Sequence, residues 1–550
     1  MKGELFTCRV YRKLISTCRW SERPLLEEAL RIIKCNSPGV YIIKLPTGYG
    51  KTGLVFAHAF SSLVGECSFS TVYASPLRSL ADDVYNRWIG IASKIIGVST
   101  EQVSGLQHMG VSGSVYLNKP IVFTTLDTLS LHVFKNPPAE IKKTLKGERG
   151  HYEVSRGALA DATIFLDEPH LAMSDEAMLK ALLALISFLE YIGSTVVLIT
   201  ATLPRKLEDI VTRSIKYLRG RLSYGEGSFV DKEFEEQQAS KLIVTKVYSK
   251  FLTSIANEKV RKMKGGRTII VFNSRKRAVE AYSSIRKSSD EVYLLHGFMI
   301  RKEREIVEEC LRKRTRKRKD FVLIATQVIE AGFDISAEWL LTEAASASSL
   351  VQRAGRVARW KGDYRGLVEI YLPPSPKPYN NEEVIRALEL IKRYKVSWRN
   401  AVITNGALSY IDFIEKASVI PEISMGEVQY LRRMIKDPLR GWVTLFKKVV
   451  EGKLLRSSRI IPVYVEGRIE DGEALADFFI LKSMLKEGGI IGYVAKEEER
   501  IGPHHARDAT GVVETLLKNP LEGFVLMLRK KVDGILIEER TYCRWAYGEQ

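Results

Sequence analysis

The sequence is poor in cysteine, with six in 550 residues, at positions 8, 18, 35, 67, 310 and 543. No two of them form a Cys-x-x-Cys pair, which argues against a zinc ribbon and a disulfide framework and suits a reducing cytosol. The sequence also has no apolar run of transmembrane length, and its N-terminus is too charged and interrupted for a signal peptide. We therefore predict a cytoplasmic protein with no membrane partner.

Acidic residues are outnumbered, because 65 Asp and Glu stand against 84 Lys and Arg, giving a net charge of +19. This excess favours a polyanionic partner. Charge alone does not distinguish DNA or RNA from a basic surface that contacts only water. At 550 residues the chain is too long for one hydrophobic core, so several domains are expected.

Two blocks of the sequence alternate short apolar runs with helical patterns, which is typical of βαβ units and parallel sheets. A stretch rich in Gly, Ser and Glu separates the blocks, and a proline-rich stretch follows the second. We predict strands at 40–44, 71–75, 121–124, 162–166 and 195–199, and in the second block at 268–272, 291–295, 321–325 and 367–372. The predicted parts are a basic prelude at 1–20, a first α/β domain at 21–222, a connector at 223–245, a second α/β domain at 246–378 and a mixed, partly helical C-terminal domain at 379–550.

The stretch Lys44–Thr52 joins the first predicted strand to a helical run. Gly48 and Gly50 let backbone N–H groups turn toward a polyphosphate, and the helix N-terminus adds a positive dipole. Lys51 supplies a charge and Thr52 a hydroxyl ligand for Mg²⁺. A generic phosphate loop has glycine where Leu45 stands, and an ordinary strand-to-helix turn is the alternative. We predict a nucleotide-binding loop made of Pro46, Thr47, Gly48, Tyr49, Gly50, Lys51 and Thr52.

Acidic residues follow the predicted strand 162–166, in the sequence Asp167-Glu-Pro-His170. The carboxyl ends of strands in doubly wound sheets are where ligands bind. Asp167 suits a metal ion and Glu168 suits the attacking water. His170 would couple this loop to a partner domain; the alternative is a helix cap followed by a buried histidine. The stretch Thr200–Pro204 follows another strand, and taken alone it is better explained as a turn than as a hydrogen-bonding link.

The second block carries a similar arrangement after the predicted strand 321–325. Gly332 permits close approach of the backbone, and Asp334 could accept from a ribose hydroxyl. Arg353, Arg356 and Arg359 recur every three residues, so we expect them on one side of a helix. Facing a phosphate loop, such arginines would neutralise charge on a transferring phosphoryl group. A solvated basic helix face is the alternative.

Five stretches in this order resemble the superfamily 2 helicases: Thr47–Thr52, Asp167–His170, Thr200–Thr202, Thr326–Asp334 and Gln352–Arg359. The last three are also similar to the CRISPR-associated helicase of type I interference systems. The resemblance implies an α/β fold of two tandem RecA-like parallel-sheet domains plus a C-terminal accessory domain. The first RecA-like domain would bind ATP and Mg²⁺, and the two would share the nucleotide.

The resemblance also assigns roles to residues. Catalytic roles fall on Lys51, Asp167, Glu168, His170, Gln352, Arg356 and Arg359, with Thr52 and Asp167 at the metal and Gly332 and Asp334 at the nucleotide. Contacts with the nucleic-acid backbone are implied for Pro76, Arg78, Thr124, Thr125, Asp127, Asn273, Ser274, Thr326 and Gln327. Hydroxyls and backbone N–H groups at strand ends track phosphates without reading bases.

The activity implied is that of an ATP-dependent DNA helicase or translocase on single-stranded DNA, recruited to a CRISPR surveillance complex in antiviral defence. Many such helicases carry a nuclease domain built on a His-Asp dipeptide. None of the eight histidines here is followed by aspartate, so we expect a separate HD nuclease subunit. The family's upstream glutamine is missing from Glu22–Glu27, which leaves adenine selectivity open. The alternatives are a general RNA or DNA-repair helicase of the same superfamily and a nucleic-acid-binding scaffold with a relic ATP site.

Two further stretches are chemically suggestive. Every residue from Arg312 to Lys319 except Thr315 is basic. Because this run precedes strand 321–325, we expect it at the sheet edge opposite the ATP contacts, as a solvated loop rather than a docking surface or an auxiliary DNA contact. His504 and His505 are adjacent, and adjacent side chains on a helix point about 100° apart, which argues against a metal site there.

Overall fold

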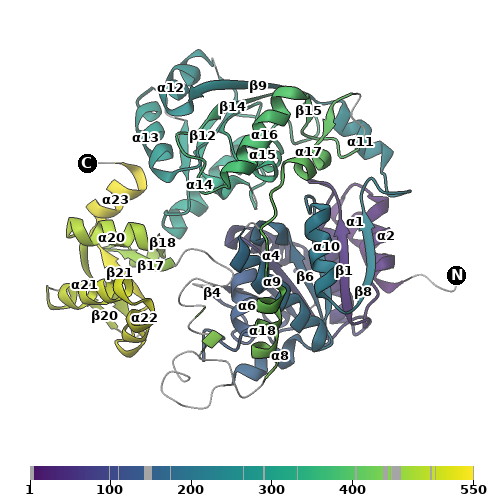
Figure 1. The fold of residues 1–550 in the computed structure, drawn as a ribbon, viewed down its shortest axis with the longest axis horizontal. Coiled ribbons are helices and arrows are strands. Elements are labelled where there is room, and N and C mark those ends of the chain that lie inside the picture. The colour runs from purple at the N-terminus through teal and green to yellow at the C-terminus, as the bar shows by residue number, and fades with distance from the viewer. Residues whose placement is uncertain are drawn as a thin grey trace. The chain divides into compact units, whose positions relative to one another are not determined.

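The computed structural model describes residues 5–548 except 98, 109–110, 141–150, 174, 264, 289–290, 331, 403–405, 438–443, 446–447, 449–459, 496–497 and 502. The chain divides into two compact units, whose elements are labelled in Figure 1. The first unit contains Met1–Glu235 and Ile420–Ser457, and the second contains Glu236–Val419 and Ser458–Gln550. Each unit is therefore built from two separate segments of the sequence.

An eight-stranded sheet forms the centre of the first unit, in the order β4-β3-β5-β2-β6-β7-β1-β8. All neighbouring strands are parallel except β3 and β4. The strands are β1 (Gly39–Lys44), β2 (Ser70–Ser75), β3 (Ser104–His108), β4 (Val111–Ser112), β5 (Ile121–Thr125), β6 (Ala162–Asp167), β7 (Thr195–Thr200) and β8 (Leu218–Ser223). The central strands are continuous apolar runs because helices cover both faces of a parallel sheet. Their carboxyl ends consequently meet at one edge.

Helices enclose this sheet and complete the hydrophobic core. They are α1 (Phe6–Cys18), α2 (Pro24–Ile32), α3 (Thr52–Leu63), α4 (Arg78–Ala92), α5 (Thr100–Val103), α6 (Leu126–Val133), α8 (Tyr152–Leu159), η1 (Pro169–Ala172), α9 (Glu176–Tyr191) and α10 (Arg205–Ser214). Helix α9 is apolar almost all round and is buried along Leu179–Leu189, as expected of a helix inside a core. The chain passes to the second unit within α11 (Lys232–Ala239).

A late segment of the sequence returns to the first unit. Helix α18 (Met425–Lys436) contributes Val428, Leu431 and Ile435 to the same core as α9. Lys135 and Arg156 donate to the backbone carbonyls of the last turn of α18 and of the residue after it. These cations at a helix C-terminus satisfy carbonyls that have no partner within the helix.

The second unit contains a six-stranded, wholly parallel sheet in the order β11-β12-β10-β13-β14-β9. Its strands are β9 (Leu242–Phe251), β10 (Arg267–Val271), β11 (Val292–Leu295), β12 (Phe321–Ala325), β13 (Trp339–Glu343) and β14 (Arg365–Leu372). Its helices are α12 (Leu252–Lys262), α13 (Arg275–Ile285), η2 (Arg286–Ser288), α14 (Arg301–Arg316), η3 (Gln327–Ile329), α15 (Ala347–Ala354), α16 (Asn381–Arg393) and α17 (Tyr410–Ala417). A short parallel pair, β15 (Val396–Ser397) and β16 (Leu408–Ser409), lies between α16 and α17.

The C-terminal part of the second unit has its own mixed sheet, in the order β18-β17-β21-β19-β20. The strands are β17 (Ile460–Val465), β18 (Ala474–Asp477), β19 (Ile490–Ala495), β20 (Glu498–Ile501) and β21 (Gly534–Ile537), with helices η4 (Ile469–Asp471), α20 (Phe478–Glu487), α21 (Pro503–Lys518), α22 (Pro520–Arg529) and α23 (Glu539–Tyr547). Phe298 and Ile300 of the preceding sheet domain belong to its core. Tyr542 and Tyr547 donate to the Glu303 carboxylate, which joins α23 to α14.

The predicted fold class is confirmed: two parallel-sheet α/β domains and a mixed C-terminal domain. All nine predicted strands are present to within one residue or two at their ends. The division between the units falls inside the predicted connector, although its last residues already belong to β9. The stretch 379–550, predicted as one domain, is divided by the structure, because 420–457 returns to the first unit.

Two local expectations were wrong. Helix α15 ends at Ala354, so Arg356 and Arg359 do not continue its face. The basic run Arg312–Lys319 is mostly the last turns of α14, not a loop, and its cations suit a helix C-terminus. Across the ranges that the structure describes, no helix is both long enough and apolar enough to cross a membrane.

Candidate ATP-hydrolysis site

The loop after β1 is held open by two glycines and anchored by two buried apolar residues. Gly48 and Gly50 adopt φ values of +80° and +94°, a region that glycine enters without steric cost. A Cβ at Gly48 would meet no atom within 4 Å, so space lies beside the backbone there. Leu45, the residue that departs from a generic phosphate loop, is buried, and its N–H donates to the carbonyl of Thr200 at 2.9 Å. The leucine therefore ties the loop to β7.

The Tyr49 side chain points into the first unit and away from solvent. Its hydroxyl donates to Asp231 Oδ2 at 2.8 Å and accepts from the Leu25 N–H at 3.3 Å. Its ring makes an edge contact with Phe234, with centroids 5.0 Å apart. Burial and the Asp231 hydrogen bond raise the pKa of Tyr49 above its usual value. Any contact of Tyr49 with a nucleotide is thus limited to its backbone.

Lys51 and Glu168 form a buried ion pair at the carboxyl edge of the sheet. Lys51 Nζ lies 2.9 Å from Glu168 Oε1, and both side chains are 12% exposed. Glu168 Oε2 accepts from the Thr200 hydroxyl at 2.9 Å and from the Ala201 N–H at 3.2 Å. Burial alone would raise the pKa of Glu168, but the charge of Lys51 and these hydrogen bonds hold it below its usual value. Glu168 is therefore an ionised acceptor in a fixed orientation.

Glu168 also has an unusual backbone. Its φ of +46° lies in the left-handed region, which a residue with a side chain seldom adopts. Such strain is concentrated at functional sites, where the surrounding structure determines it.

Asp167 is the last residue of β6, and its two carboxylate oxygens differ in their hydrogen bonding. Tyr73 donates to Oδ2 at 2.6 Å, whereas Oδ1 is buried and has no hydrogen-bond partner among the described residues. Burial, together with the neighbouring charge of Glu168, raises the pKa of Asp167 to about 6. A cation beside Oδ1 would relieve both costs, so the donor set fits Mg²⁺ with Asp167 and the hydroxyl of Thr52.

His170 joins the carboxylate loop to the residues after β7. Its Nδ1 lies 3.0 Å from the Thr200 hydroxyl and its Nε2 lies 2.8 Å from the Thr202 hydroxyl. Burial lowers the pKa of His170, so the ring is neutral and hydrogen-bonded on both sides. The turn explanation of Thr200–Pro204 was wrong, because these hydroxyls form the link between the two strand ends.

The predicted nucleic-acid contacts of the first unit differ in how free their side chains are. The Thr124 hydroxyl is buried and donates to the carbonyl of Gln107 at 2.6 Å. Thr125 is buried and caps α6 by accepting from the Thr128 N–H. Pro76, Arg78 and Asp127 are partly exposed. Of this set, Pro76, Arg78 and Asp127 are thus the side chains accessible to a polymer, and the two threonines fix the strand end beneath them.

In the second unit, Arg353 lies at the centre of a buried network. Its guanidinium is fully buried and donates to Glu330 Oε1, Thr342 Oγ1, Asn273 Oδ1 and the Tyr379 hydroxyl, at 2.6 to 3.0 Å. Arg353 therefore holds η3, β13 and the start of α16 together.

Arg356 and Arg359 have different surroundings. Arg356 is buried and donates to the backbone carbonyls of Ile329 and Glu330 at 3.0 and 2.9 Å. Arg359 is 22% exposed and pairs with the exposed Asp334, Nε to Oδ1 at 2.8 Å. Gln352 is buried within α15, and Gly332 has a φ of +77°. Arg359 and Asp334 are consequently the accessible charged groups of this set.

The remaining second-unit candidates cluster at the ends of β10 and β12. Asn273 is buried, donates to the Ala344 carbonyl and accepts from Arg353. Gln327 donates to the Asn273 carbonyl at 3.1 Å. Thr326 is buried, and Ser274 is partly exposed at the start of α13. Apart from Ser274 and Gln327, these side chains support the edge of the sheet.

Comparison with known proteins adds what geometry alone does not. Residues 26–210 match the model of the DEAD/DEAH box helicases, and residues 264–362 match that of the C-terminal part of the CRISPR-associated nuclease/helicase Cas3. The chain is 26% identical over 543 residues to the CRISPR-associated helicase Cas3 of Thermoproteus tenax, covering 94% of this chain and 89% of that relative. The chain is thus similar to Cas3 helicases over almost its whole length.

Other Cas3 proteins extend the comparison. The chain is 23% identical to a putative CRISPR-associated nuclease/helicase Cas3 of Methanocaldococcus jannaschii, over 83% of this chain but 65% of that protein. A crystal structure of T. fusca Cas3-AMPPNP matches the fold with a TM-score of 0.57 at 15% identity, over 84% of this chain and 60% of that one. A further CRISPR-associated protein structure gives 0.60 at 16% identity, over 94% and 66%. The chain thus spans about two thirds of these longer proteins.

The Cas3-like motor in this chain is an ATP-hydrolysing helicase.

Its structure includes supporting residues that sequence patterns did not identify. Tyr73, which holds Asp167, stands in the middle of a buried strand and has the pattern of a core residue. Asp231, which holds Tyr49, lies 182 residues away from it in the sequence. Neither position carries a local signal.

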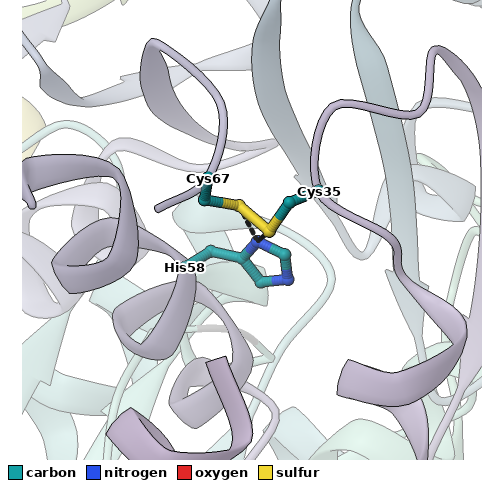
Figure 2. A group of neighbouring side chains, drawn as sticks. All are labelled: Cys35, His58 and Cys67. Carbon is teal, nitrogen blue, oxygen red and sulfur yellow. Dashed lines mark hydrogen bonds between the residues drawn. A yellow bond between two sulfur atoms is a disulfide. The ribbon is translucent and has the colours of Figure 1, made fainter. Parts of the chain in front are cut away.

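The cysteine pattern was misinterpreted. Cys35 and Cys67 form a disulfide, and His58 contacts both sulfurs (Figure 2). The spacing of the two cysteines gives no sign of this, because residues 32 apart in sequence meet only in the folded chain. Asp508, one turn after the adjacent histidines at the start of α21, pairs with Lys530.

Proposed function

We propose that this chain is an ATP-driven translocase on single-stranded DNA that serves CRISPR antiviral defence. The observation that carries the proposal is the Lys51–Glu168 pair, oriented by Thr200 and Ala201. Beside it lies Oδ1 of Asp167, which is buried and has no partner among the described residues. A relic ATP site would have no reason to preserve a strained, buried carboxylate with this many donors. The proposal therefore favours a working motor over a scaffold.

The residues of the first unit would divide the chemistry among them. The phosphate loop would bind the polyphosphate through backbone N–H groups and Lys51. Asp167 and Thr52 would hold Mg²⁺, which when bound neutralises charge on the phosphates. Glu168 would orient and polarise the attacking water, because its carboxylate is ionised and fixed. His170 would relay the state of this loop to the strand ends through Thr200 and Thr202.

The second unit would contribute positive charge. Arg359 suits contact with the transferring phosphoryl group because it is partly exposed and pairs with an exposed carboxylate. Arg356 would support the same stretch, and Gln352 and Gly332 would shape it. When Arg359 contacts the phosphoryl group, the Asp334 carboxylate would lose its ion pair with Arg359 and accept a hydrogen bond from a ribose hydroxyl instead.

Single-stranded DNA is proposed as substrate from the family and from the charge of +19. We propose Pro76, Arg78, Asp127, Ser274 and Gln327 as contacts with its backbone, and Thr124, Thr125, Asn273 and Thr326 as the residues that position them.

Partners are proposed from the same comparison. The relative from Thermoproteus tenax is called a helicase, whereas the longer one from Methanocaldococcus jannaschii is called a nuclease/helicase. With no His-Asp dipeptide in this sequence, we propose that a separate HD nuclease subunit cuts the DNA at a surveillance complex. Genes for both beside the gene for this chain would support the setting.

Phosphate release in the presence of matched single-stranded DNA and RNA tests the substrate. DNA should stimulate hydrolysis about tenfold or more above RNA, because the 2′-hydroxyl lets a protein distinguish the two polymers. Equal or stronger stimulation by RNA would contradict the DNA assignment. Glu168→Gln should lower the stimulated rate by about 10²–10⁴ while ATP still binds. Its matched control, Glu176→Gln on the surface of α9, should retain the full rate.

The nuclease proposal has an independent test. The purified chain should leave labelled single-stranded DNA intact with Mg²⁺ or Mn²⁺. Metal-dependent cleavage that persists in the Glu168→Gln variant would show a nuclease within this chain.

A further inference from the structure

The disulfide between Cys35 and Cys67 lies at the end of the first sheet away from the phosphate loop. Cys35 precedes β1 and Cys67 lies between α3 and β2. The two Cα atoms are 4.9 Å apart. Figure 2 shows the sulfur–sulfur bond beside the ring of His58, which comes from α3.

The bond closes one particular structural unit. The two cysteines are 32 residues apart in sequence, and the segment between them contains β1, the phosphate loop and α3. Lys51 and Thr52 are therefore part of a covalent ring. A cross-link of this kind reduces the conformational freedom of the unfolded chain and so favours the folded one.

The surroundings of the bond are dry and neutral. His58 is fully buried and Cys67 is 6% exposed, whereas Cys35 is partly exposed. His58 Nδ1 lies 3.4 Å from Cys67 Sγ and 3.9 Å from Cys35 Sγ. Burial lowers the pKa of His58 to about 3, so the ring stays neutral. The partial exposure of Cys35 gives a reductant access to one sulfur.

A metal ion is the rival occupant, because the three donor atoms lie within 4.8 Å of one another. Two observations disfavour it. Structural zinc sites need four ligands, and no fourth His, Cys, Asp or Glu joins the group within the described part of the chain. A ligating histidine normally donates its second ring nitrogen to an acceptor, but Nε2 of His58 is buried with no partner among the described residues.

We propose that the Cys35–Cys67 disulfide is a structural cross-link that stabilises the phosphate-loop unit against unfolding and makes its stability dependent on redox conditions. Reduction by a dithiol transfers two electrons and two protons to the pair. The sulfur–sulfur bond breaks, two thiols form, and the reductant becomes its own disulfide. In the reduced form the Cys67 thiol would donate to His58 Nδ1, which gives the new thiol a hydrogen-bond partner.

The cross-link should act on stability and not on nucleotide affinity. The phosphate loop is held independently by β7 and β8 on either side of β1, by Leu45 through Thr200, and by Tyr49 through Asp231. These contacts remain when the distant bond is cut.

Thiol counting and thermal unfolding of the full chain test the proposal. Alkylation of the denatured protein should label four cysteines without reductant and all six after treatment with a phosphine reductant. The unfolding temperature of the first unit, followed by hydrogen exchange of α3 peptides, should fall by about 10 °C on reduction. Cys35→Ser/Cys67→Ser should show the same loss without reductant. ATP affinity at 25 °C should be unchanged within the error of the titration.

The control variant and the outcomes that would contradict the proposal are measured without any assay of helicase activity. Cys18→Ser, which changes a partly exposed cysteine of the same unit, should unfold at the parental temperature with and without reductant. Six labelled cysteines in the untreated protein, or an unfolding temperature unaffected by reduction, would overturn the cross-link. So would stoichiometric zinc in the isolated protein, or cobalt(II) giving a thiolate charge-transfer band that the double serine variant lacks.

Discussion

The candidate residues of the two parallel-sheet domains are organised in opposite ways. In the first, Lys51, Glu168 and His170 bond mainly to one another and to hydroxyls at the same sheet edge. In the second, three arginines from one short motif have three separate environments: a closed buried network, backbone carbonyls and an exposed carboxylate. The role open to a motif residue therefore depends on how many of its hydrogen-bonding groups are already paired within the protein.

Changing Arg359 should have a large effect on rate and almost none on stability. Arg359→Ala should lower the DNA-stimulated kcat by about 10³, the usual contribution of such an arginine. Loss of its exposed ion pair with Asp334 should cost less than about 1 kcal/mol in the free energy of unfolding. Steady-state kinetics and urea denaturation measure the two quantities. Arg365→Ala, on the exposed start of β14, is the matched control, and full activity of Arg359→Ala would end the assignment.

Changing Arg353 should, in contrast, act mainly on the free energy of unfolding. Arg353→Met would leave Glu330 buried without its cation, which costs about 3–5 kcal/mol in the free energy of unfolding. Adding Glu330→Gln should restore part of that loss, since the uncompensated charge is then removed. A variant as stable as the parent in urea denaturation would show that the network is not structural.

Acidification should lower the folding stability of the two units by different amounts, and this is the smallest of the expected effects. Burial lowers the pKa of His58 and His132 in the first unit, and of His296 in the second, to about 3. Because the unfolded chain binds these protons near pH 6.5 and the folded chain does not, stability falls as pH drops from about 6.5 toward 3. Each histidine should cost about 2 kcal/mol by pH 5, so the first unit should lose more.

Unfolding of each unit followed by hydrogen exchange at pH 7 and pH 5 measures this difference. His132→Gln should make the first unit less sensitive to pH. A first unit equally stable at both pH values would refute the expectation.

Sequence patterns predicted the architecture and the residues at strand ends because both have local signals. Apolar runs mark buried parallel strands, and Gly48, Lys51, Asp167 and Glu168 follow such runs directly. The edge strands β8 and β9 were missed because they are partly exposed and less uniformly apolar. The inner strands β3 and β13 were also missed, since both are only five residues long and include polar residues.

Long-range partnerships could not be predicted in the same way. The disulfide joins residues 32 apart in sequence, and the Tyr73–Asp167 bond connects residues of neighbouring strands 94 positions apart. The three-residue spacing of the arginines predicted one helix face, but α15 ends between the first and the second. Spacing indicates a common face only while the helix continues.

Helix α18 determines how this protein can be divided. A polypeptide that stops after residue 235 would lack Val428, Leu431 and Ile435, leaving an apolar area of α9 bare and the cations of Lys135 and Arg156 without their carbonyls. Such a fragment should be prone to aggregate, and a peptide spanning 420–437 should rescue it by binding in trans. Fragment complementation, rather than simple truncation, is the way to obtain the ATP-binding half by itself.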